Sequence, residues 1–202
     1  MEDSLSRKLR LAHEKYLAGF LAANPEKMAE LAAADYEDGV ITIAHFQEEI
    51  AVEAATGEMT PKPKQLLEEI LILKYLQEVQ GIVGPGNDYL AFVQLPFGSH
   101  HSKAFQKEVS EALSERFGAD FEGFRVAAEK LGGVPAKDGD ISYILPFFPK
   151  IHVKVILWAA DEEFPAAASF LFDNKCSFHM DTDGLNELAN ATTARLIAEA
   201  SK

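Results

Sequence analysis

The clearest pattern of apolar and polar positions in the chain is the stretch Ile141–Asp173, which predicts the centre of a β-sheet. Two of its runs, Ile141–Phe147 and His152–Trp158, are rich in branched and aromatic residues, which suit a half-buried pleated surface. Pro149-Lys150 separates the two runs, so a hairpin is the simplest connection. A third run, Ala167–Phe172, is expected to continue the sheet.

Shorter patterns elsewhere predict further strands and several helices. The expected additional strands are Val40–His45, Glu49–Ala54, Tyr89–Leu95 and a short return at Ser177–Met180, and Val134–Gly139 is expected to be a polar turn. Apolar residues at helical spacing predict helices at Leu5–Phe20, after Asn24-Pro25, at Lys64–Gln80, at His101–Phe117, after Asp120, and after Asp181 or Asp183.

The helix Lys64–Gln80 is apolar around much of its circumference, which is typical of a helix buried on more than one side. The strands cluster along the chain and do not alternate one-to-one with helices, which favours an α+β fold. We therefore expect a mainly antiparallel sheet packed against this buried central helix, with flanking N- and C-terminal helices. Residues 1–202 are expected to form a single globular domain, with residues 1–35 as a helical N-terminal arm packed on it.

Composition narrows the classes of partner. The net charge is −13, so nucleic acid and anionic membranes would be repelled, whereas a protein partner with a basic surface or a homodimer stays open. The single cysteine, Cys176, cannot build a zinc cage, a protein-held iron–sulfur cluster or a disulfide framework. The apolar runs are shorter than a membrane span, and the first residues lack an apolar signal core, so we expect a soluble, cytoplasmic protein.

The first candidate site joins a strand end to a helix start at Leu95–Lys103. His100, His101 and Lys103 lie beside the expected N-terminus of a helix, where free N–H groups suit an anion, a carboxylate or a metal-bearing ligand. The other interpretation is a polar loop in which a serine caps the helix. The glycine-containing stretch Gly81–Gly86 precedes a strand, so it does not fit the phosphate-binding fingerprints.

The second candidate site is the acidic corner Asp161, Glu162 and Glu163. Clustered carboxylates can hold a hard cation or act as general acid and base. Trp158 and Phe164 on either side could supply the apolar walls of a ligand cavity. The alternative is a solvated turn that shields a sheet edge.

Several short motifs in the second half of the chain form a set. They are Leu131-Gly132-Gly133, Gly139-Asp140, Pro146 to Pro149, Trp158-x-x-Asp161-Glu162-Glu163-Phe164-Pro165 and Leu171-Phe172-Asp173, with Leu95-Pro96-Phe97-Gly98 and Phe105 before them. This set, over residues 64–180, resembles an uncharacterised family of proteins from anaerobic bacteria and archaea. The resemblance implies an α+β domain of unknown function, found in some relatives beside an iron–sulfur module, and it assigns no catalytic residues.

Three hypotheses for function follow. The first is a domain that binds a small molecule or cofactor, such as a tetrapyrrole or a metal-bearing ligand, through His100, His101, Lys103 and the Trp158–Phe164 corner. The second is an enzyme that uses the clustered carboxylates, which requires the two corners to meet in space. The third is a protein-interaction module that presents an acidic face to a basic partner. The identity of any cofactor stays open, and no metal ligands are assigned.

Overall fold

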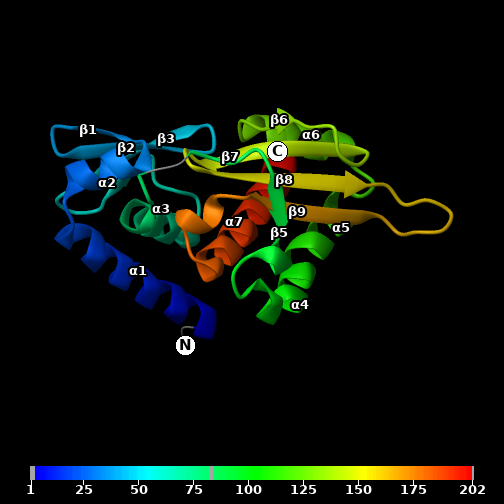
Figure 1. The fold of residues 1–202 in the computed structure, drawn as a ribbon, viewed down its shortest axis with the longest axis horizontal. Helices are drawn as coiled ribbons and strands as arrows, with labels where there is room; N and C mark the ends of the chain where they lie inside the picture. Colours follow the sequence, from blue (N-terminus) through cyan, green and yellow to red (C-terminus); the bar gives the residue numbers. More distant parts are fainter. Residues whose placement is uncertain (1–2, 82–83, 202) are drawn as a thin grey trace.

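The computed structural model describes residues 3–81 and 84–201, in which strands form two separate antiparallel sheets. The smaller sheet comes from the N-terminal part of the chain and the larger one mainly from the second half, and Figure 1 shows helices gathered around both. The predicted α+β class and the antiparallel pairing are confirmed, although the strands divide between two sheets.

The larger sheet has the expected hairpin at its centre. Its strand order is β5 (Tyr89–Ala91), β9 (Ala167–Asp173), β8 (Ile151–Trp158), β7 (Ile141–Phe148) and β6 (Val134–Pro135), and every neighbouring pair is antiparallel. The register places Tyr143, Val155 and Phe170 side by side, and all three are buried. One face of the sheet therefore contributes a continuous apolar layer to the core, as the alternation of residues predicts.

The smaller sheet contains β1 (Asp35–Glu37), β2 (Val40–His45), β3 (Glu48–Glu53) and β4 (Met59–Thr60) in that order. The hairpin β2–β3 corresponds to the predicted strands Val40–His45 and Glu49–Ala54, and the two short outer strands are additional. The turn of this hairpin joins the two sheets, because the backbone N–H of Phe46 donates to the carbonyl of Phe147 over 3.2 Å.

The helices lie close to their predicted positions. They are α1 (Ser4–Ala22), α2 (Pro25–Ala32), α3 (Leu66–Glu78), α4 (Ser102–Phe105), a π-helical segment η3 (Gln106–Glu111), α5 (Ala112–Phe117), α6 (Phe121–Lys130) and α7 (Thr182–Ala200). The side chains of Asn24, Asp120 and Asp181 each accept a hydrogen bond from a backbone N–H in the first turn of α2, α6 and α7. The predicted N-caps are therefore present.

Helix α3 is buried along nearly its whole length, as its composition predicts. Its neighbours are mainly other helices: α1, α2 and α7 pack around it. It reaches the larger sheet through Tyr75, whose ring stacks on Phe148 with centroids 4.4 Å apart. The central helix thus connects the N-terminal helices to the sheet.

Three local expectations are wrong. The expected strand Tyr89–Leu95 ends at Ala91, because residues 92–94 form a 3₁₀ turn, η1, whose Gln94 side chain accepts a hydrogen bond from the Ala91 N–H. Ser177–Met180 does not form a strand, since Cys176–Phe178 is a 3₁₀ turn, η4. The expected turn Val134–Gly139 begins with strand β6.

The buried carboxylate of Asp173 fixes the path of the chain after β9. It accepts hydrogen bonds from the N–H groups of Gly86, His152 and Lys175 at 2.9–3.0 Å. Three N–H donors satisfy a charge that could not otherwise remain buried. These hydrogen bonds fix the turn after β9, so the segment after Lys175 runs towards α7. That segment forms one wall of a surface cavity.

Within residues 3–81 and 84–201, we find no helix that combines the length and the apolar character needed to span a membrane.

Candidate functional site

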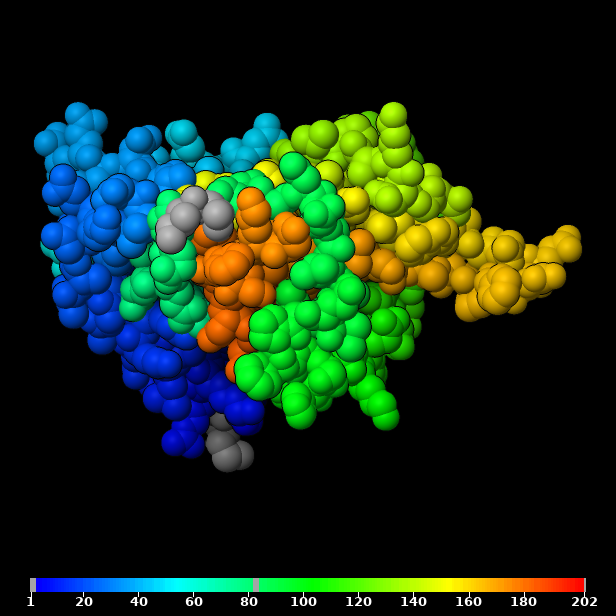
Figure 2. All heavy atoms as spheres, in the orientation of Figure 1, coloured from blue at the N-terminus to red at the C-terminus, as the bar shows by residue number. Residues whose placement is uncertain are grey.

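A surface cavity of about 410 Å³ lies where the loop before α4 meets the start of α7. We name it the His–Asp cavity. It is lined by Pro96, Phe97, His100, His101, Ser177, Met180, Asp181, Thr182 and Asp183. Its size is within the range of small-molecule sites. Figure 2 shows the two segments that form it, green for the loop and orange for residues near 180, next to each other on one face of the molecule.

The first wall is a tightly folded loop that contains η1 (Phe92–Gln94) and η2 (Gly98–His100). A Cβ atom at Gly98 would lie 1.9 Å from the carbonyl oxygen of Phe92, so only glycine fits there. The preceding residue, Phe97, has a left-handed backbone with φ of 61°, and its side chain is 80% exposed. A left-handed conformation is unfavourable for a bulky residue. The loop therefore holds an exposed aromatic ring in a strained position at the edge of the cavity.

The second wall is η4 and the first turn of α7. Asp181 caps α7 through the N–H of Gly184 at 2.7 Å, and its other oxygen accepts from Lys74 Nζ at 3.0 Å. The Thr182 hydroxyl donates to the carbonyl of Pro96 at 2.6 Å, which ties the two walls together. Residues more than eighty positions apart in the chain thus share one site.

Lys74 is held in its charged form beside this wall. Its burial disfavours the charge, but hydrogen bonds from Lys74 to Glu78, Tyr16 and Asp181 outweigh that effect and raise the pKa of Lys74 above its ordinary value. The Asp181 carboxylate is therefore engaged on two sides, which leaves Asp183 as the other carboxylate in the lining.

Of the residues predicted for the first candidate site, His100 and His101 line the His–Asp cavity and Lys103 does not. The lining also contains the carboxylates of Asp181 and Asp183, which would repel an anion. In the ranges 3–81 and 84–201, no group of three or more histidine, cysteine, aspartate or glutamate side chains is arranged to hold a metal ion. The sequence indicated Asp181 and Asp183 as helix caps and, with the nearby His179, as conceivable metal ligands, but nothing local connected them with His100.

The acidic corner lies elsewhere. Asp161, Glu162 and Glu163 belong to the β8–β9 loop, which projects beyond the body of the molecule and away from α4 (Figures 1 and 2). Trp158 is 37% exposed and Phe164 is 65% exposed, and neither residue lines the His–Asp cavity. The structure therefore brings His100 and His101 together with Asp181 and Asp183, and it leaves the Trp158–Phe164 corner apart from them.

The Asp161 carboxylate has a local role in that loop. It accepts hydrogen bonds from the N–H groups of Phe164 and Glu163 at 2.7 and 2.8 Å, and these bonds hold the pKa of Asp161 below its ordinary value. A general acid at neutral pH needs a raised pKa, so this environment does not favour Asp161 as a general acid.

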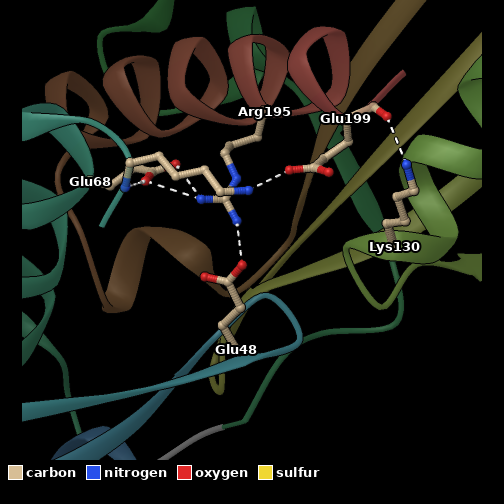
Figure 3. Close-up of polar contacts among 6 residues, drawn as sticks. Glu48, Glu68, Lys130, Arg195 and Glu199 are labelled. Atoms are coloured by element: carbon tan, nitrogen blue, oxygen red, sulfur yellow. Dashed lines mark hydrogen bonds and ion pairs between the residues drawn. The ribbon is translucent and has the colours of Figure 1, made fainter. Parts of the chain in front are cut away.

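A second polar cluster lies in the interior, where α7 meets α3 and the β2–β3 turn (Figure 3). The Arg195 guanidinium is 1% exposed and contacts both oxygens of the fully buried Glu68 at 3.3 Å and Glu48 at 3.0 Å. Lys64 contacts the Glu199 carboxylate, and Lys130 Nζ donates to the Glu199 carbonyl at 3.0 Å. Because Arg195 and Glu68 are both nearly inaccessible to solvent, we assign this cluster to stability.

The chain was compared with known proteins at the level of families, curated sequences and solved structures. Neither the curated proteins nor the solved structures gave a match. One family model, described as Domain of unknown function (DUF3786), matches residues 24–195. That span holds every strand of the described residues, both walls of the His–Asp cavity and the buried Arg195 cluster up to Arg195 itself. The chain therefore belongs to the DUF3786 family of domains of unknown function.

Proposed function

We propose that this chain binds a small molecule in the His–Asp cavity. The observation that carries the proposal is Phe97, an exposed ring held at the cavity edge by a left-handed backbone. Strained residues of this kind persist when the surrounding structure imposes them, and they cluster at binding sites. An exposed aromatic ring beside an open cavity offers a flat apolar surface on which a ligand ring can stack.

The lining supports a particular class of ligand. Phe97, Pro96 and Met180 offer apolar surface, whereas Asp183 accepts hydrogen bonds and the two imidazoles can donate or accept them. This combination suits a ring-containing molecule that carries basic or hydrogen-bonding groups. A tetrapyrrole is one member of this class, and its absorbance would reveal it in the purified protein.

Replacing Phe97 by glycine is expected to stabilise the fold. Glycine adopts a left-handed backbone without the steric cost, and the exposed ring contributes little burial, so the free energy of unfolding should rise by about 0.5–1 kcal/mol. Urea denaturation followed by circular dichroism measures this change. Phe164→Gly is the matched control, because it removes another exposed phenylalanine from a residue that is not among those with positive φ. A loss of stability in Phe97→Gly larger than in the control would contradict the strain argument.

The binding function is tested on Phe97→Gly and on two further variants. The purified protein is examined by native mass spectrometry and by an absorbance scan, and a library of aromatic fragments with basic groups is screened by saturation-transfer NMR. Fragments that bind wild-type protein should lose their signal in Phe97→Gly and in the double variant His100→Ala/His101→Ala, and keep it in Phe164→Ala. Fragment binding that is unaffected by the cavity variants would overturn the proposal.

A protein-interaction role is the second candidate. The observation in its favour is the projecting β8–β9 loop, which carries the exposed Phe164 beside Glu162 and Glu163. Exposed aromatic residues are common anchors of protein interfaces. Loss of salt-sensitive association with basic proteins in Phe164→Ala, with fragment binding intact, would favour this role over the first.

A further inference from the structure

A larger cavity, of about 480 Å³, lies between the N-terminal half of α1, helix α3 and the start of α7. We name it the helix cavity. Helix α1 lies against one side of α3 and α7 against another, so α3 forms the floor between them. The helix cavity shares Asp181 and Asp183 with the His–Asp cavity, and the hydrogen bond from Lys74 to Asp181 lies between the two.

The floor of the helix cavity is apolar apart from Lys74, whose charge is already paired with Glu78 and Asp181. Leu67, Ile70 and Leu71 of α3 line it, together with Leu9 and Ala12 of α1. Ile70 and Leu71 are nearly inaccessible to solvent, so a ligand would rest on the surface of the core. A surface of this kind binds the apolar body of a ligand by removing it from water.

The two sides of the helix cavity carry opposite charges. Lys8 and Lys15 lie on the α1 side, and Asp183 and Glu187 lie on the α7 side. Within residues 3–81 and 84–201, no ion pair joins either lysine to either carboxylate. The apolar floor therefore separates charges that do not neutralise each other directly.

The α7 side also concentrates negative charge. Asp183 and Glu187 are four residues apart on one helix, a spacing at which like charges repel. Partial burial, with Glu108 and Asp183 nearby, raises the pKa of Glu187 above its ordinary value. A positive group of a ligand placed here would relieve that repulsion.

We propose that the helix cavity binds an elongated zwitterion, in which an apolar body separates an anionic group from a cationic one. The anionic group would lie near Lys8 and Lys15, the cationic group near Asp183 and Glu187, and the body on Ile70 and Leu71. A molecule with both charges at one end, such as a zwitterionic lipid head group, does not match charges that lie on opposite sides. The family match begins at residue 24, so the lysine side lies outside it and the carboxylate side lies within it. The proposal does not rest on the function proposed for the His–Asp cavity.

The test compares four probes of equal chain length: aminooctanoate with its amine at the far end, octanoate, octylamine and octanediol. Binding to the full chain is measured by isothermal titration calorimetry, and the site is identified by the NMR shifts of the Ile70 and Leu71 methyl groups. Exposed charge pairs contribute about 0.2–1 kcal/mol each, so aminooctanoate should bind about 1.4- to fivefold more tightly than either singly charged probe. Octanediol should bind most weakly.

Variants locate the two charges. Lys8→Gln/Lys15→Gln should reduce aminooctanoate binding about two- to fivefold and leave octylamine binding unchanged. Glu187→Gln should reduce octylamine binding and leave octanoate binding unchanged. Lys27→Gln, an exposed lysine of α2 outside the cavity, is the matched control. His100→Ala/His101→Ala should have no effect on any probe, which separates this site from the His–Asp cavity.

Three results would overturn the proposal. They are no saturable binding of aminooctanoate at millimolar concentration, octanediol binding as tight as that of aminooctanoate, or charge variants (Lys8→Gln/Lys15→Gln and Glu187→Gln) that behave like Lys27→Gln. Ala12→Trp should fill the cavity and abolish binding of all four probes. If that variant fails to fold, the charge variants alone decide the outcome, because substitutions at their exposed positions leave the core intact.

Discussion

Replacing Arg195 by methionine is expected to lower the free energy of unfolding by about 3–5 kcal/mol, the typical cost of removing one partner of a buried ion pair. Arg195 is the cation that faces the Glu68 carboxylate, which is fully buried, whereas Glu48 remains partly exposed to water (Figure 3). Burial already raises the pKa of Glu68 above its ordinary value, against the opposing effect of Arg195. Without the guanidinium, Glu68 would have to stay charged in the core or take up a proton. Urea denaturation at neutral pH measures the loss.

Two further variants show whether the charge itself is responsible. Arg125→Met removes an arginine that pairs with Glu122 and Glu129 on the exposed face of α6, and it should cost less than about 1 kcal/mol. The double variant Arg195→Met/Glu68→Met leaves no unpaired charge and should recover much of the lost stability. If Arg195→Met costs no more than Arg125→Met, the ion pair is not important for stability.

Acidification from about pH 7 to pH 5 is expected to destabilise the folded protein through His45 by roughly 2 kcal/mol. His45 is fully buried, and burial is the main reason that its pKa falls to about 3, with the nearby charge of Arg195 acting in the same direction. In the unfolded chain its pKa is about 6.5. Between these two values the unfolded state binds a proton that the folded state does not, so stability falls as the pH falls from about 6.5 towards 3.

The variant His45→Leu removes this titration. Its stability should depend less steeply on pH than that of the wild type between about pH 7 and pH 5. The substitution should be tolerated, because the Phe147 carbonyl that His45 Nδ1 contacts also accepts the N–H of Phe46. Ile43→Val, at a buried position two residues before His45, is the matched control: it should lower stability by about 0.5–1.5 kcal/mol at every pH. Parallel pH profiles for wild type and His45→Leu would show that His45 is not kept neutral by the fold.

Local signals predicted most of the secondary structure. Asn24 with Pro25 located the start of α2, the apolar character of Lys64–Gln80 located α3, and the paired runs around Pro149 located the β7–β8 hairpin. Each of these depends on contacts within one helix or one hairpin. The errors fall on segments of two to three residues, such as β6 and η4, because such short pieces carry no periodicity and take their form from what they pack against.

The sequence by itself determined the α+β class and the choice of His100 and His101 as candidate residues, since the pattern of strands and the position of a loop before a helix are local properties. Only the tertiary structure decided what these histidines face. Asp181 and Asp183, which line the same cavity, are about eighty residues away in the chain, and the hydrogen bond from Thr182 to Pro96 joins the two segments. Likewise, the spacing of Trp158 and Phe164 was compatible with a cavity wall, and the projecting β8–β9 loop leaves both exposed. The physical reason is that side-chain periodicity reports which residues avoid water, whereas the identity of the surface that covers them depends on packing between distant parts of the chain.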